Sequence, residues 1–371
     1  MLPTGQSKPS GIFHKILRLL LLSIFILGCF VTAFLIYHKS STNWLNDPLK
    51  SSHLAKYIQD VFSAKSKDLI IDKNMTIVLV WLWPFRKAYE TNVCGSAFNI
   101  EGCFITADRK FYNKSDGVVI HHRDIAGDLS NLPKSQRPPF QKWVWMNLES
   151  PSNSGRLSRI NNLFNLTLNY RRDSDIHVPY GSIVAADTVE DFVPPSKNKL
   201  VCWIVSNWSP NHARSKYYNE LKKNIKIQTY GRAFQKSLSQ NGYLNTMSSC
   251  KFYLSFENSV HKDYITEKLY IPLSMGTVPV VLGTTRENYE NFVPRDAFIH
   301  VDDFKSPKEL ADYLLLLDKN QEMYLGYFKW RRHFKVYRIN SWAERTCHAC
   351  DYLKRHKEYR AFKNLNKWYW G

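Results

Sequence analysis

Residues 250–283, CKFYLSFENSVHKDYITEKLYIPLSMGTVPVVLG, hold the densest set of side chains that could carry chemistry. The pattern predicts a buried strand, a polar loop, a helix and a second strand. Thr266 suits the N-cap of the helix, with Glu267 and Lys268 in its first turn, and Gly276 suits its end. A helix that follows a strand in an α/β unit directs free N–H groups at the ligand crevice, so a phosphate site is expected. The alternative is an ordinary βαβ unit with a solvated loop.

Two acidic segments lie earlier in the chain. Glu149, in WMNLESP, follows a predicted strand, and loops at the carboxyl ends of such strands often carry sites. Taken alone, Glu149 is more often a surface loop carboxylate. Asp173 and Asp175, in RRDSD, imitate the DxD of metal-dependent glycosyltransferases, but Arg171 and Arg172 adjoin them. Local salt bridges explain these two acids better, and we predict no obligatory metal.

A third candidate is Arg214, in the first turn of a helix predicted over about 212–223. Its guanidinium could bind a diphosphate through two parallel hydrogen bonds, and the helix dipole would add attraction of the same sign. The alternative is a solvated arginine, because several lysines share the segment.

The elements that must position these residues follow a βα rhythm. Apolar runs of strand length occupy 77–83, 117–121 and 142–147, and a second series begins at Leu200. The segment over 181–200, with AADTVED and VPPSKNK, is the predicted linker. No GxGxxG occurs, which argues against a dinucleotide-binding enzyme. We predict an α/β, GT-B-like fold of two facing Rossmann-like domains.

Composition limits the possible partners. The 371 residues carry a formal charge of +19, which favours a polyanionic partner. The basic residues are scattered, without a Lys/Arg block, zinc-finger spacing or an RNP-like motif, so nucleic acid is not expected. The diphosphate of a nucleotide sugar would be attracted by the same positive charge at a single site. Solubility of the protein surface explains much of the remaining charge.

An N-terminal anchor is expected. Residues 19–37 carry no charge and are long enough to span a membrane, while Lys8, Lys15 and Arg18 precede them. This predicts a type II protein with residues 38–371 in the lumen. In the stem that follows, an apolar helical face would pack on the catalytic domain or on a second copy in a dimer.

Sequons and cysteines agree with a lumenal location. Asn74, Asn113 and Asn165 are predicted glycosylation sites, whereas Pro210 disfavours the sequon at Asn207. Six cysteines lie outside the predicted span, and an even number in an oxidising compartment implies disulfides, with 15 possible pairings. The six are Cys94, Cys103, Cys202, Cys250, Cys347 and Cys350.

Several of these motifs together resemble one known family. FENSxxxDYITEKL with VPVVLG, NLESP, VPYG, YRRDSDI and VSNW with HAR are similar to the signature segments of the α-1,3-fucosyltransferases. The similarity runs from about residue 77 to the C-terminus and is closest to the fucosyltransferase 9-like branch. It implies the disulfides Cys94–Cys347, Cys103–Cys350 and Cys202–Cys250.

The resemblance also implies a role for each matching residue. Glu149 would be the general base. Arg214 and Lys268 would stabilise the leaving diphosphate, and Glu267 would meet the charge that develops on the fucose ring. Lys87, in WPFRKAYE, occupies a position near the acceptor where related enzymes tend to carry a neutral side chain. The remaining donor contacts would be Tyr180, Ser206, Asn207, Tyr253, Asn258 and Tyr264.

The implied reaction moves L-fucose from GDP-fucose to O3 of N-acetylglucosamine in N-acetyllactosamine, with inversion and without an obligatory metal or other cofactor. The product would be of the Lewis x type, and the acceptors would be glycans of glycoproteins and glycolipids. The implied location is the Golgi membrane, and a homodimer is possible. The alternatives are a membrane-anchored, lectin-like glycan binder without turnover and a binder of anionic surfaces.

Two further expectations complete the prediction. Pro272 lies inside the helix that begins at Thr266, where a proline bends or destabilises a helix, so a bend behind the site is expected. His261 is interpreted as structural. The predicted organisation is a cytoplasmic tail (1–18), a transmembrane helix (19–37), a stem (38–72), an acceptor-binding domain (73–190), a donor-binding domain (191–340) and a tail that returns to the first domain (341–371).

Overall fold

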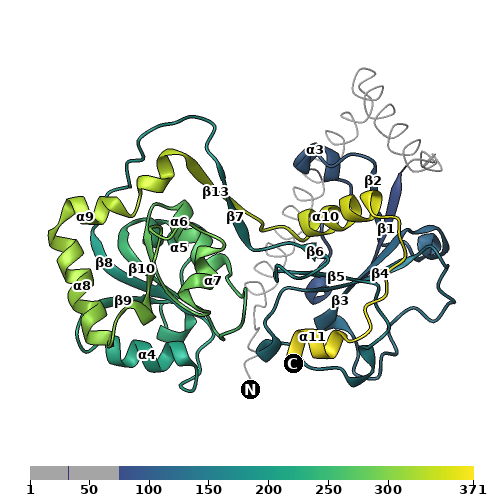
Figure 1. The fold of residues 1–371 in the computed structure, drawn as a ribbon, viewed down its shortest axis with the longest axis horizontal. Coiled ribbons are helices and arrows are strands. Elements are labelled where there is room, and N and C mark those ends of the chain that lie inside the picture. The colour runs from purple at the N-terminus through teal and green to yellow at the C-terminus, as the bar shows by residue number, and fades with distance from the viewer. Residues whose placement is uncertain (1–31, 33–74) are drawn as a thin grey trace, which may run out of the picture. The chain divides into compact units, whose positions relative to one another are not determined.

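The computed structural model describes Thr32 and residues 75–371 (Figure 1). The predicted cytoplasmic tail, the span over 19–37, the stem and the sequon at Asn74 lie outside these residues, apart from Thr32. Within the described part of the chain, no helix combines the length and the apolar character that a membrane crossing requires. Residues 75–371 lie in one compact unit, which contains two parallel sheets.

The first sheet has six parallel strands in the order β2-β1-β3-β4-β5-β6. The strands predicted over 117–121 and 142–147 have these bounds in the structure. Both are buried at every position, as expected for strands covered on two faces. The strands are β1 (Thr76–Leu82), β2 (Cys103–Thr106), β3 (Gly117–His121), β4 (Lys142–Asn147), β5 (Leu166–Asn169) and β6 (Ile176–His177).

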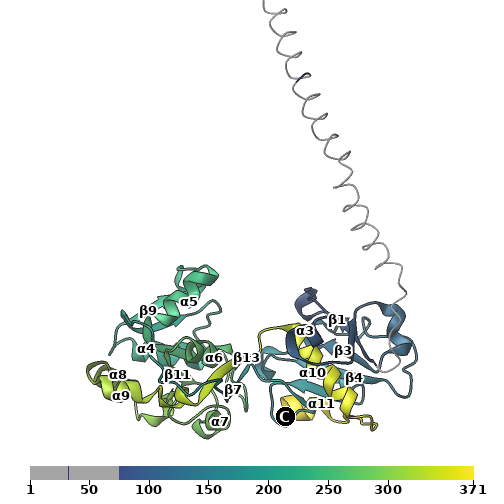
Figure 2. The ribbon, with the colours of Figure 1, turned by 90° about the horizontal axis from the view of Figure 1, so that it is seen from above.

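Helices from the C-terminal end of the chain cover both faces of this sheet (Figure 1 and Figure 2). The helix α10 (Trp342–Arg355) packs Leu353 into the core on one face, and α11 (Leu365–Trp370) packs Tyr369 into the core on the other. The βα rhythm predicted here is therefore wrong about the helices. The connections contain 3-10 turns and the short helix α3 (Cys94–Phe98), because the cover that a parallel sheet needs is supplied from far along the chain.

The second sheet has five parallel strands in the order β12-β11-β10-β8-β9. Here helices do alternate with strands, and they pack on both faces of the sheet. Its elements are β8 (Lys199–Ile204), α4 (Ala213–Leu221), β9 (Ile227–Tyr230), α5 (Gln240–Ser248), β10 (Cys250–Phe256), α6 (Glu267–Ser274), β11 (Val278–Leu282), α7 (Arg286–Glu290), β12 (Ile299–His300), α8 (Pro307–Lys319) and α9 (Gln321–Gly326). The first sheet with α3, α10 and α11 is called here the first lobe, and the second sheet with α4 to α9 the second lobe.

Two antiparallel strands connect the lobes, β7 (Gly181–Ala185) and β13 (Phe334–Arg338) (Figure 1). The segment 181–200, predicted as the linker, contains the connecting strand β7 and continues to β8 of the second lobe, which starts at Lys199. A Cβ on Gly181 would lie 2.6 Å from the ring of Tyr270 and 2.9 Å from a backbone carbonyl, so only glycine permits this close packing.

The structure contains the three disulfides that the resemblance implies. Cys94–Cys347 and Cys103–Cys350 join residues separated by 253 and 247 positions; the first ties α10 to α3 and the second ties α10 to β2 of the first sheet. Cys202–Cys250 joins the neighbouring strands β8 and β10 of the second lobe.

The sequon prediction fails at Asn165. This side chain is 1% exposed, and its Oδ1 accepts hydrogen bonds from the backbone N–H of Trp143 at 2.8 Å and from Arg137 at 2.9 Å. Its Nδ2, the atom that a glycan would occupy, donates to the carbonyl of Arg360 at 2.6 Å. A glycan there is incompatible with this fold, whereas Asn113 is exposed.

Pro272 lies inside α6, as its sequence position predicts, and its side chain is buried. The helix continues past it to Ser274, and the chain then leaves through Gly276 at a φ of +66°. The first turn, with Glu267 and Lys268, precedes the proline, so the helix begins undisturbed at its N-cap.

Candidate active site

A cavity of about 810 Å³ is lined by residues that follow strand ends in both lobes. Carboxyl ends of parallel strands are where α/β proteins collect ligand-binding loops. All the side chains predicted to be the base or to contact the donor line this one cavity: Glu149, Tyr180, Ser206, Asn207, Arg214, Tyr253, Asn258, Tyr264, Glu267 and Lys268.

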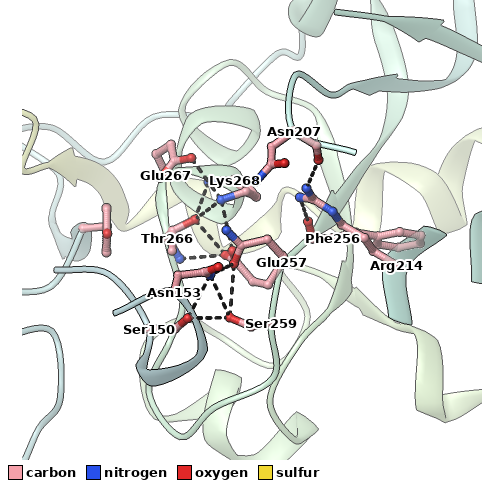
Figure 3. A network of polar contacts seen from close by, with 12 residues as sticks. Ser150, Asn153, Asn207, Arg214, Phe256, Glu257, Ser259, Thr266, Glu267 and Lys268 are labelled. Carbon is pink, nitrogen blue, oxygen red and sulfur yellow. Dashed lines mark hydrogen bonds and ion pairs between the residues drawn. The ribbon is translucent and has the colours of Figure 1, made fainter. Parts of the chain in front are cut away.

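On the second-lobe side, the cavity is organised by the start of α6 (Figure 3). Thr266 is the N-cap, as predicted, and its hydroxyl accepts a hydrogen bond from the backbone N–H of Lys268. The ammonium of Lys268 lies 3.0 Å from Oε2 of Glu257 and 3.1 Å from Oε1 of Glu267. It also donates to Thr266 Oγ1 at 2.8 Å, so all its donors are engaged.

Glu257 is a functional candidate that the sequence analysis missed. It is 2% exposed, and its Oε1 accepts from both the backbone N–H of Thr266 at 2.9 Å and the Thr266 hydroxyl at 2.8 Å. Burial raises the pKa of Glu257, whereas Lys268 opposes this shift. Burial would lower the pKa of Lys268, but the carboxylates of Glu257 and Glu267 outweigh it and raise that pKa. A buried glutamate directly after a strand was the available signal.

Arg214 is the second cation of this side. It lies in the first turn of α4, as predicted, and is only 4% exposed. Its guanidinium donates to the carbonyls of Asn207 and Phe256, and its Nε has no hydrogen-bond partner within the described residues (Figure 3). Burial lowers the pKa of Arg214, with Glu257 opposing the shift. Two carbonyls therefore fix the guanidinium at the wall of the cavity.

Glu149 reaches the cavity from the first lobe, directly after β4. Its backbone carbonyl accepts from the hydroxyl of Tyr369 in α11, and its backbone N–H donates to Asn147 Oδ1 at 3.3 Å. Its carboxylate is 27% exposed and lies 3.9 Å from the guanidinium of Arg123. The backbone is held by protein groups while the carboxylate stays available, as a proton acceptor requires.

The loops that carry Glu149 and Asn258 contact each other directly (Figure 3). Ser259 Oγ donates to Ser150 Oγ at 2.6 Å, and Asn153 Nδ2 donates to Asn258 Oδ1 at 3.0 Å. His261, interpreted as structural, is 2.6 Å from Ser152 Oγ and does not line the cavity. The two halves of the site are thus hydrogen-bonded to each other across the lobes.

The acidic pair in RRDSD does not line the cavity. Asp173 pairs with Arg171 at 2.7 Å, as predicted. Asp175 is bound by Arg360 at 2.8 Å and accepts from Thr167 at 2.8 Å. Among the described residues, no group of three metal-ligating side chains is close enough to hold an ion.

Lys87 is exposed and does not line the cavity, so its acceptor role stays a prediction. Phe85, two positions earlier, does line it, together with His121, Trp342 and Arg345. The sequence analysis did not identify these residues. The last two belong to α10, and no local pattern indicates that the C-terminal tail reaches the site.

Comparison with known proteins agrees with this geometry. Residues 73–181 match the family model described as the N-terminal fucosyltransferase domain. Residues 194–368 match the model described as the C-terminal domain of glycosyltransferase family 10 (fucosyltransferase).

Curated relatives match over nearly the whole chain. The 4-galactosyl-N-acetylglucosaminide 3-α-L-fucosyltransferases 9 of Rattus norvegicus and Homo sapiens are each 54% identical over 356 residues. Both alignments cover 96% of this chain and 98% of the relative. The 3-galactosyl-N-acetylglucosaminide 4-α-L-fucosyltransferase FUT3 of Pan troglodytes is 40% identical, with 99% of each chain covered.

A solved structure titled as an α1,3-fucosyltransferase with GDP-fucose has the same fold. It aligns with a TM-score of 0.50 at 18% identity, covering 77% of this chain and 92% of that one. The likeness supports the GT-B-like arrangement of two parallel sheets. With matching family models over both lobes and relatives that align from end to end, this chain belongs to glycosyltransferase family 10, the fucosyltransferases.

Proposed function

We propose that this protein transfers L-fucose from GDP-fucose to O3 of the N-acetylglucosamine in N-acetyllactosamine, with inversion. The observation that carries the proposal is the single cavity into which all the predicted base and donor residues converge. The 3-linkage follows the names of the relatives at 54% identity, rather than that of the 4-α-L-fucosyltransferase at 40%.

In the proposed reaction, Glu149 removes the proton from the acceptor hydroxyl as the new bond forms. Its carboxylate is the one acidic group that the first lobe contributes to the cavity lining within the described residues. The base and the donor groups come from opposite lobes, which suits attack from the face opposite the leaving diphosphate. Inversion of configuration requires this arrangement.

The leaving diphosphate would be stabilised by Arg214 and Lys268. Because Lys268 is engaged by two carboxylates, the diphosphate must replace one of them. Glu257 is buried and anchored by Thr266, whereas the Glu267 side chain is 43% exposed. Glu267 is therefore the partner that leaves, and its carboxylate then becomes available to the fucose ring.

The remaining parts of the proposal concern setting and cofactors. We propose a Golgi type II membrane protein with a lumenal catalytic region, in which N-acetyllactosamine-terminated glycans yield Lewis x products. Disulfides in the described region support an oxidising compartment. We propose that no metal is obligatory, since two protein cations serve the diphosphate. Activity that disappears with EDTA and returns only with Mn²⁺ would overturn that part.

The decisive experiment replaces Glu149 by Gln in the full chain. Glu149→Gln keeps the shape of the side chain but cannot take a proton, so transfer to lactosamine should fall about 10³-fold. GDP-fucose binding, measured by calorimetry, should remain within twofold, because the cations proposed to bind the diphosphate, Arg214 and Lys268, lie in the other lobe from Glu149. Product linkage is checked by NMR.

Glu322→Gln, on the exposed surface of α9, is the matched control and should retain full transfer. Near-normal turnover of Glu149→Gln would remove the base assignment. Lactosamine binding by the wild type without any GDP release would instead indicate a lectin-like protein.

A further inference from the structure

The segment 354–363, KRHKEYRAFK, connects α10 to α11 and takes no part in lining the cavity (Figure 1). It runs along the amino ends of the first-lobe strands. The carbonyl of His356 accepts from Lys142 Nζ, at the start of β4, at 2.6 Å. The carbonyl of Arg360 accepts from Asn165 Nδ2, just before β5, at 2.6 Å. Because the cavity follows the carboxyl ends of strands, this segment, called here the basic edge, lies at the opposite edge of the first sheet.

The basic edge carries mainly positive charge. Its ten residues include five lysines and arginines and a single acid, and all five basic side chains are exposed. Arg355 and Arg360 are each paired with an aspartate. Lys357 and Lys363, in contrast, form no ion pair with any carboxylate in the described part of the chain. These two charges are therefore available to an anion outside the protein.

Two exposed aromatic side chains lie at the same edge of the sheet. Tyr359 belongs to the basic edge, and Phe140 lies just before β4. They are 70% and 56% exposed, more than any other aromatic side chain among the described residues. Exposed rings beside free cations suit the interface of a bilayer, where rings enter the interfacial layer and cations meet acidic headgroups. A soluble polyanion would use the cations but gives no reason for the rings.

The chain also enters the first lobe at this edge. The backbone N–H of Thr76, at the start of β1, donates to the carbonyl of Gly102 at 2.9 Å. Lys354 Nζ, from the basic edge, donates to the adjacent carbonyl of Glu101 at 3.0 Å. The chain before Thr76 leads back to the span predicted over 19–37. A tether that starts here would keep the basic edge at a high local concentration near a bilayer.

We propose that the basic edge docks on a bilayer surface with acidic headgroups. Lys357 and Lys363 meet the phosphate or carboxylate groups of the lipids, and Tyr359 and Phe140 enter the interfacial layer. The inference rests on the proposed type II setting, which supplies the bilayer. Because the cavity lies at the opposite edge of the first sheet, docking leaves it open to glycans on the side away from the bilayer.

Hydroxyl-radical footprinting, read by mass spectrometry, tests this contact in the full chain. The protein is incorporated into nanodiscs of phosphatidylcholine alone, or of phosphatidylcholine and phosphatidylserine in equal parts. In the acidic discs, oxidation of Tyr359 and Phe140 should fall about fivefold. Two exposed rings of β13, Phe334 and Tyr337, should be oxidised equally in both kinds of disc. High salt should remove the protection, because exposed charges are screened.

Two paired variants test the cause of the protection. Each lysine near an acidic surface strengthens binding about fivefold, so Lys357→Gln with Lys363→Gln should weaken docking about 25-fold. Oxidation of Tyr359 in the acidic discs should then return to its level in neutral discs. Lys305→Gln with Lys319→Gln removes the same charge from the exposed surface of the second lobe and should keep the protection. Both variants should transfer fucose to soluble lactosamine within twofold of the wild type, since none of these lysines lines the cavity.

Equal oxidation of Tyr359 in the two kinds of disc, or protection that survives the loss of both lysines, would overturn the proposal. Protection by soluble heparin in neutral discs, without protection by acidic lipid, would overturn it in favour of a sulfated glycan. If Tyr359 is protected while soluble lactosamine receives no fucose, the docking surface stands and the proposed function fails. Fucose transfer without protection gives the reverse result.

Discussion

The two sides of the cavity are built in opposite ways. On the second-lobe side, a polar network comes from one continuous stretch, in which Glu257, Thr266, Glu267 and Lys268 bond to one another within the segment 257–268. The first-lobe side gathers Phe85, Glu149 and Trp342 from segments far apart, and disulfides hold its last component in place.

This difference shows how each side of the cavity holds its side chains in place. A strand–loop–helix unit fixes its own side chains through short-range bonds, so its polar residues form a motif that can be recognised in the sequence. The first-lobe side depends on chain closure over more than two hundred residues. Its residues are held in place by the two long-range disulfides and by the packing of α10 and α11.

Removing the two long-range disulfides of the first lobe should have the largest effect on stability. A variant with serine at Cys94, Cys103, Cys347 and Cys350 loses both long-range disulfides. The chain-entropy relation gives a loss on the order of 5 kcal/mol in the free energy of unfolding, measured by denaturant titration. Transfer should fall with it, because Trp342 and Arg345 leave the cavity wall.

The comparison predicts that donor binding survives this change. The second lobe keeps its own disulfide, Cys202–Cys250, and its local bonds. GDP binding at low temperature, where the variant stays folded, should remain within a few fold of the wild type. Equal loss of GDP affinity and transfer would show that the second-lobe side is not self-contained.

The next largest effect should be a loss of folding stability at low pH, caused by protonation of His122 in the first lobe. This ring is 2% exposed, its Nδ1 accepts from Trp145 Nε1 at 3.1 Å, and its Nε2 is 2.8 Å from the carbonyl of Gly155. The bond from Trp145 requires the neutral ring, since a protonated Nδ1 would face another N–H, whereas Nε2–H donates to the Gly155 carbonyl in either protonation state. Burial lowers the pKa of His122 from 6.5 to about 4.

The folded pKa is below the unfolded one, so the unfolded chain binds the extra proton. The neutral His122 ring therefore contributes about 3 kcal/mol to the free energy of unfolding. This contribution is fully present above pH 6.5 and is lost as the pH falls towards 4. Unfolding measured at pH 7 and pH 4.5 should show this loss. His122→Gln can copy both bonds without titrating, and its stability should depend less steeply on pH; an unchanged slope would contradict the assignment.

A substitution at Glu257, on the second-lobe side, should have a smaller effect on stability. In Glu257→Gln, either the amide NH₂ faces the ammonium of Lys268 or it faces the backbone N–H of Thr266, and both arrangements oppose two donors. We expect a loss of about 2 kcal/mol in the free energy of unfolding. Glu220→Gln breaks an exposed pair with Lys223 and should cost less than about 1 kcal/mol. Equal effects would mean that the buried network is no stronger than a surface pair.

Local features of the fold could be predicted from sequence because they follow from local rules. Strand bounds at Gly117–His121 and Lys142–Asn147, the N-cap at Thr266 and the helix after His212 all depend on patterns of a few residues. The errors concern longer range. The missing helices of the first lobe, the strand at Gly181–Ala185 and the buried Asn165 depend on partners far along the chain.

The sequence alone determined the parallel α/β class, the family and many of the residues that line the second-lobe side of the cavity, because these lie in contiguous, chemically distinctive segments. The tertiary structure alone decided that Glu257 and Glu267 engage Lys268. It also decided that the C-terminal helices cover the first sheet and that Phe85, His121 and Trp342 meet beside Glu149. The physical reason is that a contact between distant segments depends on how the whole core closes, and no pattern within either segment records it.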